Sequence, residues 1–154
     1  MKNNFWKAVF WSGIIAAMVM LVLEMIMNPL FLDNSMWGPV RMIGAIALGR
    51  GVLPPPATFE IGVFLGAAIV HLPLSVIYSA IIGSFVRKMS GGLAVLVGAV
   101  IGLVLYFLNF YVFTSLFPWF AEARNWVQIV IHLLFGVAVV LPFKAIYSEN
   151  VVRE

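Results

Sequence analysis

The sequence predicts an all-α membrane protein: a four-helix transmembrane bundle with a short interfacial or re-entrant helix between helices 1 and 2. Of its 154 residues, 64% are hydrophobic and only 10% are charged, whereas globular chains carry about 25% charged residues. The apolar residues form four blocks, each long enough for the roughly 20 residues that a helix needs to cross a bilayer. We therefore expect a single integral membrane domain over residues 1–154.

The four expected spans cover about residues 8–31, 60–85, 93–117 and 126–143. Between the first two lies an apolar segment, residues 36–48, which is too short to span. Segments of this length are typical of interfacial or re-entrant helices. At the other end of the chain, Pro142 and Lys144 mark the expected close of the last span.

Cationic residues at the ends of the spans predict the orientation. With the N-terminus inside, the six inner cations are Lys2, Lys7, Arg87, Lys88, Lys144 and Arg153, and the three outer ones are Arg41, Arg50 and Arg124. Because the side richer in lysine and arginine stays in the cytoplasm, we expect both termini there. These cations flank apolar blocks, so the expected partner is the lipid bilayer and not nucleic acid. The arginines beside segment 36–48 are expected to contact headgroups, or to pair with Asp33 or Glu60.

Each span carries one strongly polar residue, and the four are expected at similar depths in the outer half of the bundle. They are Glu24, His71, Asn109 and His132. At a rise of 1.5 Å per residue, they would lie about 8–15 Å below the outer boundary. An ionisable residue inside a span is costly, and therefore indicates a functional site. Asn28 and Gln128 lie one turn from members of this layer and are expected to support it.

Three functional hypotheses use these residues. The first is a b haem held between His71 and His132, since imidazole binds iron and bundle cores hold cofactors. Gly136, one turn from His132, would leave room for a flat group beside the ring. The second is a metal site of Glu24, His71 and His132, a ligand set that suits zinc or non-haem iron. The third is a proton or cation path in which Glu24 and the histidines relay charge.

A purely structural interpretation also accounts for the polar layer. In it, Glu24 hydrogen-bonds a histidine or Asn109 and ties the helices together. The chain has no cysteine, phosphate-binding loop or nucleophile–base motif, so an enzyme is not the expected class. We expect an accessory or assembly protein that carries a buried polar site. Exposed faces for a larger membrane complex or a second copy are expected at small residues with four-residue spacing: Gly62 and Gly66, and Ala94, Gly98 and Gly102.

The central stretch of the chain carries a resemblance to a known family. Residues 44–54, GAIALGRGVLP, are followed by the span that contains His71. This arrangement resembles a family of small bacterial inner-membrane proteins of unassigned function, some members of which carry the automatic label sodium:proline symporter. The resemblance implies a multi-pass protein of the bacterial inner membrane, and it assigns no functional residue.

Overall fold

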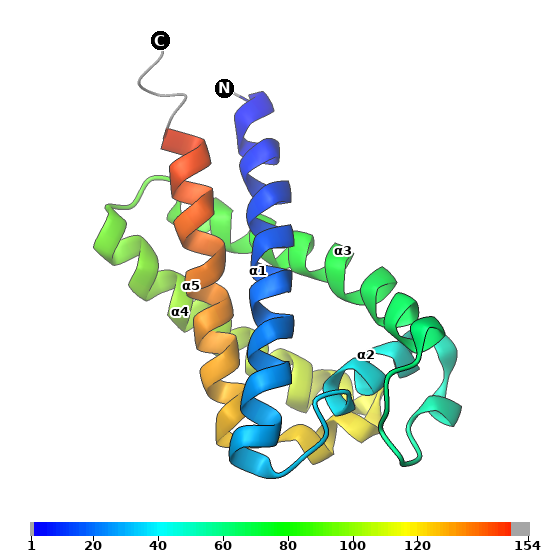
Figure 1. The fold of residues 1–154 in the computed structure, drawn as a ribbon. Coiled ribbons are helices and arrows are strands. Elements are labelled where there is room, and N and C mark those ends of the chain that lie inside the picture. Colours follow the sequence, from blue (N-terminus) through cyan, green and yellow to red (C-terminus); the bar gives the residue numbers. More distant parts are fainter. Residues whose placement is uncertain (1, 149–154) are drawn as a thin grey trace.

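The computed structural model describes residues 2–148, so Arg153 of the predicted inner cations lies outside the described residues. Within this range the chain is helical and contains no strand. The five α-helices are α1 (Lys2–Leu32), α2 (Gly38–Leu48), α3 (Ile61–Val86), α4 (Gly91–Phe107) and α5 (Trp126–Ser148). All but α2 belong to segments long and apolar enough to cross a membrane. The predicted all-α, four-helix architecture with a short helix between its first two long helices is confirmed (Figure 1).

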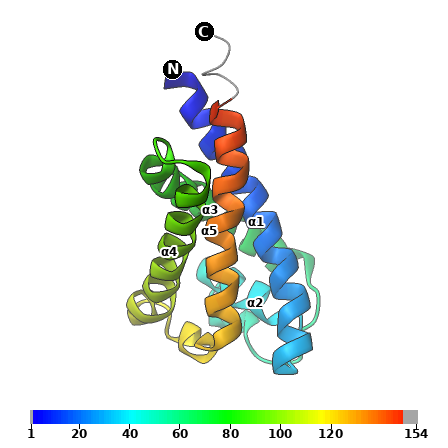
Figure 2. The same cartoon turned by 90° about the vertical axis from the view of Figure 1, so that its left-hand side faces the viewer.

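The helices are arranged as two groups that share α1. In one group α5 packs between α1 and α4, and in the other α3 packs against α1 and α2. Figures 1 and 2 show α1 and α5 side by side, with α3 crossing the bundle obliquely. The start of α1 and the end of α5 lie at the same end of the molecule, which we call the termini end. We call the opposite end, where residues 33–60 and 116–125 connect the helices, the cap end.

The termini half of the bundle is densely packed. Its buried apolar residues come from all four long helices and include Val9, Ile82, Val139 and Phe143, each at most 1% exposed. The ring of Phe143 lies against Gly83, where an added Cβ would come within 2.6 Å of it. The helix α5 continues through Pro142 to Ser148 instead of closing at the proline.

Close contact between α4 and α5 depends on glycine. A Cβ on Gly136 would lie 2.0 Å from the carbonyl oxygen of Gly98, and one on Gly102 would lie 2.1 Å from that of His132. Ala94, Gly98 and Gly102 are therefore buried inside the bundle, and Gly66 packs against Leu48 of α2. Four of the five small residues expected on exposed partner faces are thus buried, because the chain uses them for its own helix contacts. Gly62 alone among them is exposed with open space beside it.

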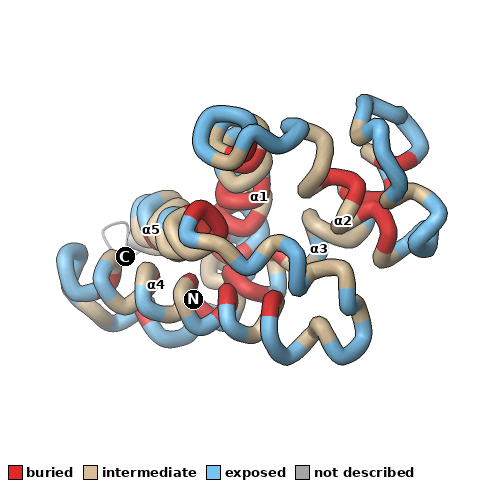
Figure 3. The backbone as a smooth tube through the Cα atoms, turned by 90° about the horizontal axis from the view of Figure 1, so that it is seen from below, coloured by how far each residue is buried: buried red, intermediate tan, exposed pale blue. Residues whose placement is uncertain are grey.

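Arg41 joins α2 to the connection that follows it. Its side chain is buried, donates hydrogen bonds to the carbonyl oxygens of Val52 (2.7 Å) and Thr58 (3.1 Å), and pairs with Glu60 at 3.5 Å. The pairing alternative predicted for this arginine is therefore the one observed. Figure 3 shows that part of α2 is buried. Held in this way, α2 packs on α3 and forms one wall of the site described below.

Candidate functional site

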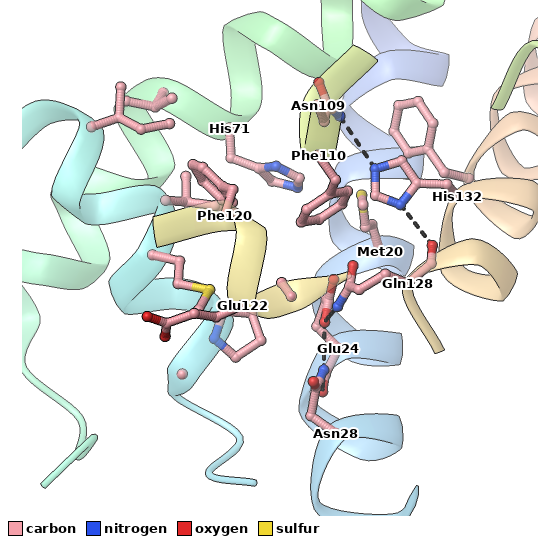
Figure 4. Close-up of a pocket in the computed structure, with 18 of the residues that line it drawn as sticks. Met20, Glu24, Asn28, His71, Asn109, Phe110, Phe120, Glu122, Gln128 and His132 are labelled. Atoms are coloured by element: carbon pink, nitrogen blue, oxygen red, sulfur yellow. Dashed lines mark hydrogen bonds between the residues drawn. The ribbon is translucent and has the colours of Figure 1, made fainter. Parts of the chain in front are cut away.

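A cavity of about 400 Å³ lies in the cap half of the bundle (Figure 4). We call it the chamber. Its walls come from α1, α2, α3, the first turns of α5 and the irregular segment that follows α4. All six residues predicted for the site line it: Glu24, Asn28, His71, Asn109, Gln128 and His132. The structure therefore brings together side chains that are up to 108 positions apart, from Glu24 to His132.

Two amides hold the carboxyl group of Glu24 on the chamber wall. Glu24 is 7% exposed, and its Oε2 accepts hydrogen bonds from the side-chain amides of Asn28, on the next turn of α1, and Gln128 of α5, the latter at 2.8 Å. Its Oε1 accepts no hydrogen bond from the described residues, and no described lysine or arginine forms an ion pair with it. The expected hydrogen bond from Glu24 to a histidine or to Asn109 is not formed, because the carboxyl group is bonded to the amides of Asn28 and Gln128 instead.

Gln128 presents a buried polar atom without a partner. The residue is 3% exposed, and its Nε2 is used by Glu24. Its Oε1 has no hydrogen-bond partner among the described residues. A buried amide oxygen left unpaired costs about 1–3 kcal/mol, so such an atom in a cavity wall indicates a donor that comes from outside the protein chain.

His132 is held by hydrogen bonds at both ring nitrogens. Its Nδ1 donates to the carbonyl oxygen of Gln128 at 2.9 Å, and since a carbonyl can only accept, the proton resides on Nδ1. Its Nε2 therefore accepts from the side-chain amide of Asn109 at 3.2 Å. The rings of Tyr106 and Phe110 pack edge-on against the imidazole at 5.7 and 5.4 Å. His132 is thus a fixed structural element of the chamber wall.

Asn109 connects three helical segments at the edge of the chamber. It lies on a turn of π-helix, Leu108–Val112, that directly follows α4. Its Oδ1 accepts a hydrogen bond from the hydroxyl of Tyr78 on α3 at 2.6 Å, while its amide donates to His132 on α5. The wider π turn places the side chain where both partners can reach it, and such turns occur often at functional sites.

His71 faces the chamber from α3 with one nitrogen free. Its Nε2 donates to the carbonyl oxygen of Ala17 on α1 at 3.2 Å. The lone pair of its Nδ1 has no partner among the described residues. Figure 4 shows the His71 ring directed into the chamber, on the side opposite Gln128. Ser75, one turn further along α3, adds a buried hydroxyl to the same wall.

The arrangement does not fit axial ligation of a haem by His132. Both of its nitrogens are hydrogen-bonded, so iron could bind Nε2 only after the bond to Asn109 breaks. Gly136, expected to leave room for a flat group, instead packs against the backbone of α4. Within residues 2–148 no three His, Cys, Asp or Glu side chains lie close enough to hold a metal ion. Glu24, His71 and His132 line one chamber without forming a set of metal ligands.

Several chamber residues were not identified from the sequence. Phe110 and Phe120 come from the irregular segment after α4, and Pro39 and Ile43 come from α2. The short helix Pro118–Ala123 holds Phe120 over the chamber, and Trp119 secures it by donating to the carbonyl oxygen of Met42 at 3.0 Å. No spacing rule applies to such a segment, and α2 was expected to be an interfacial or re-entrant helix, without a role in the site.

Comparisons with known proteins do not identify a family for this chain. It matches no protein-family model, no curated protein and no solved structure.

Proposed function

We propose that this chain is a small accessory protein of the membrane that binds a small molecule in the chamber and has no catalysis of its own. The observation that carries the proposal is the unpartnered Oε1 of Gln128, buried in the wall of a cavity of about 400 Å³. Beside it, Oε1 of Glu24 is also without a partner among the described residues. A ligand with a donor head pairs with Oε1 of Glu24, and it pairs with Oε1 of Gln128 once that side chain turns toward the chamber.

The free polar atoms define the chemistry of the ligand. Oε1 of Gln128 and Nδ1 of His71 are acceptors in the arrangement described above, and Oε1 of Glu24 is a third acceptor when the carboxyl group is ionised. The hydroxyl of Ser75 can act as donor or acceptor. The remaining wall is largely aromatic and aliphatic, with Phe110, Phe120 and Phe135 among its members. The matching ligand therefore has a hydrogen-bond-donating head, an amine or hydroxyl, on an apolar body, as in most small-molecule sites.

The same geometry favours binding over passage across the bilayer. Tyr78 of α3 and Phe135 of α5 meet at the end of the chamber nearest the termini, with ring centroids 6.4 Å apart. Beyond them lies the densely packed core that contains Ile82, Val139 and Phe143. The chamber is therefore blind on that side. The alternative, a proton or cation relay through Glu24 and the histidines, would need a second arrangement in which this core opens.

The distribution of cations supports an orientation. The cap end holds α2 with Arg41, the turn with Arg50 and the connection with Arg124, whereas the termini end holds the start of α1 with Lys7, the end of α3 with Arg87 and Lys88, and the end of α5 with Lys144. By the positive-inside rule, the termini face the cytoplasm and the chamber lies in the outer half of the membrane. For a chain of the bacterial inner membrane, as the family resemblance implies, its ligand would come from the periplasmic side or from the outer leaflet.

Calorimetry with a minimal probe tests the proposal. Benzylamine supplies a donor head on an aromatic body, and toluene supplies the same ring without the donor. We expect saturable binding of benzylamine to the purified protein, and binding weaker by about tenfold or more in Gln128→Met and Glu24→Gln, since each loses a charged or buried hydrogen bond.

Asp33→Asn is the matched control, because it removes a carboxylate from the exposed cap end without touching the chamber. This variant should bind benzylamine as the wild type does. The proposal is overturned if benzylamine gives no saturable binding, if toluene binds equally well, or if Gln128→Met and Glu24→Gln both retain the wild-type affinity.

A further inference from the structure

A second cavity of about 280 Å³ lies between α1, α2 and α3 and adjoins the chamber. We call it the groove. Five residues line both cavities: Met20, Glu24, Pro39, Ile43 and His71. Among the described residues, Glu24 and His71 are the only polar side chains of its lining. The polar groups of the groove thus stand where it meets the chamber, and the rest of its surface is apolar.

The groove reaches the lipid-facing surface of the bundle. Met18, which is 52% exposed, lies on its wall together with Leu21 of α1 and Ala68 of α3. Along α3 its lining extends from Phe64 to Leu72, a length of about 12 Å at the rise of an α-helix. A slot of this length that opens sideways into a membrane is long enough to take part of a hydrocarbon chain.

We propose that the natural ligand is a single-chain amphiphile that enters from the bilayer, with its amine or hydroxyl head in the chamber and its apolar tail in the groove. The inference rests on the proposed function and specifies its ligand. It commits to one occupant because the groove leads directly to unpartnered acceptors, Oε1 of Glu24 and Nδ1 of His71, which an ordinary acyl chain cannot satisfy. In such a ligand the donor head pairs with the acceptors in the chamber, and the apolar tail fills the groove.

The two cavities can be tested separately because Ala68 lines the groove and not the chamber. Ala68→Trp fills the groove with a large side chain, and Ala68→Leu does so more mildly if the tryptophan impairs folding. Ile69→Trp is the matched control: it places the same ring on the next residue of α3, which is 71% exposed and lines neither cavity.

The probes are dodecylamine, which carries a tail, and benzylamine, which fits within the chamber. Since lipid tails are as apolar as the groove, we expect the variant to act by steric exclusion and not by lost hydrophobic burial. Ala68→Trp or Ala68→Leu should weaken dodecylamine binding about tenfold or more and change benzylamine binding less than about twofold, because Ala68 lines the groove and no part of the chamber. Ile69→Trp should change neither.

Dodecylamine binding that both Ala68 variants leave unchanged overturns the inference, because the groove then holds only ordinary lipid chains. Equal loss of both probes in folded Ala68→Leu also overturns it, since groove and chamber would not be separate parts. In the first case benzylamine binding that still depends on Gln128 leaves the chamber proposal standing, so the two proposals fail by different results.

Discussion

The side-chain amide of Asn109 donates to Nε2 of His132 at 3.2 Å, and the carbonyl oxygen of the same amide accepts from Tyr78 at 2.6 Å. One residue on a π turn thereby fixes α3 and α5 at the level of the chamber. The same two helices also meet where Tyr78 packs on Phe135 and where Phe143 packs on Gly83, and both pack against α1.

Removal of Asn109 should therefore destabilise the bundle measurably. Asn109→Ala leaves the hydroxyl of Tyr78 and Nε2 of His132 without their partner. Interhelical hydrogen bonds in membranes contribute about 0.6 kcal/mol each, so we expect a loss of roughly 1 kcal/mol in the free energy of unfolding. Equilibrium unfolding in a denaturing detergent measures it. Ser84→Ala, which removes a bond within one exposed helix turn, should have almost no effect.

The glycine contacts between α4 and α5 predict a large difference between two similar substitutions. A Cβ on Gly136 would lie 2.0 Å from a backbone oxygen of α4, whereas one on Gly62 meets no atom within 4 Å. Gly136→Ala should cost about 1–3 kcal/mol of stability through forced separation of the helices, and Gly62→Ala should be neutral or slightly stabilising. Equal thermal stability of the two variants would contradict this contact.

Absorption spectroscopy decides the haem hypothesis. Because both nitrogens of His132 are hydrogen-bonded, we expect purified protein reconstituted with haem to show no Soret change on reduction that depends on this residue. A reduced-minus-oxidised Soret signal in the wild type that disappears in both His71→Ala and His132→Ala would establish bis-histidine ligation and show that the wall of the chamber rearranges.

Flux measurements in liposomes address the relay alternative. With the packed core between the chamber and the termini end, the wild-type protein should conduct protons and monovalent cations no faster than protein-free liposomes. Glu24→Gln should then leave this baseline unchanged. Flux in the wild type that Glu24→Gln abolishes would assign transport to the chain and would require the core around Phe135 to open.

The fold was largely predictable because hydrophobic length is a strong signal. Each long apolar block forms a helix, as predicted. The rise per residue predicted similar depths in the membrane for Glu24, His71, Asn109 and His132, and the structure places all four around one chamber. Depth along a helix is set by a constant rise per residue, so it can be counted from the sequence. His71, Ser75 and Tyr78 all line the chamber from α3, because residues at helical spacing share one face of a helix.

What could not be predicted depends on contacts between segments that are distant in sequence. The small residues of α4 were expected to face a partner, yet they pack against Gly136 of the same chain, because spacing does not specify which helix is the neighbour. Partners within the site were also misassigned: Glu24 bonds Asn28 and Gln128 and not a histidine. The π turn at Asn109 and the position of Phe120 have no periodic signal at all.

The central claim, a blind chamber in the cap half of the bundle, is tested most directly by cysteine accessibility. The chain has no cysteine, so single variants can be labelled selectively. Ser75 and Ser79 lie one turn apart on α3 and are 2% and 0% exposed. Ser75 lines the chamber, whereas the hydroxyl of Ser79 is hydrogen-bonded to Ser12 and to the carbonyl oxygen of Val9 in the packed core. The experiment compares the rates at which Ser75→Cys and Ser79→Cys react with aminoethyl methanethiosulfonate.

Ser75→Cys should react at least about tenfold faster than Ser79→Cys, since thiol reactivity follows access, and benzylamine should slow the reaction of Ser75→Cys alone. Equal rates for the two variants in folded protein, or faster labelling of Ser79→Cys, would contradict the chamber as described.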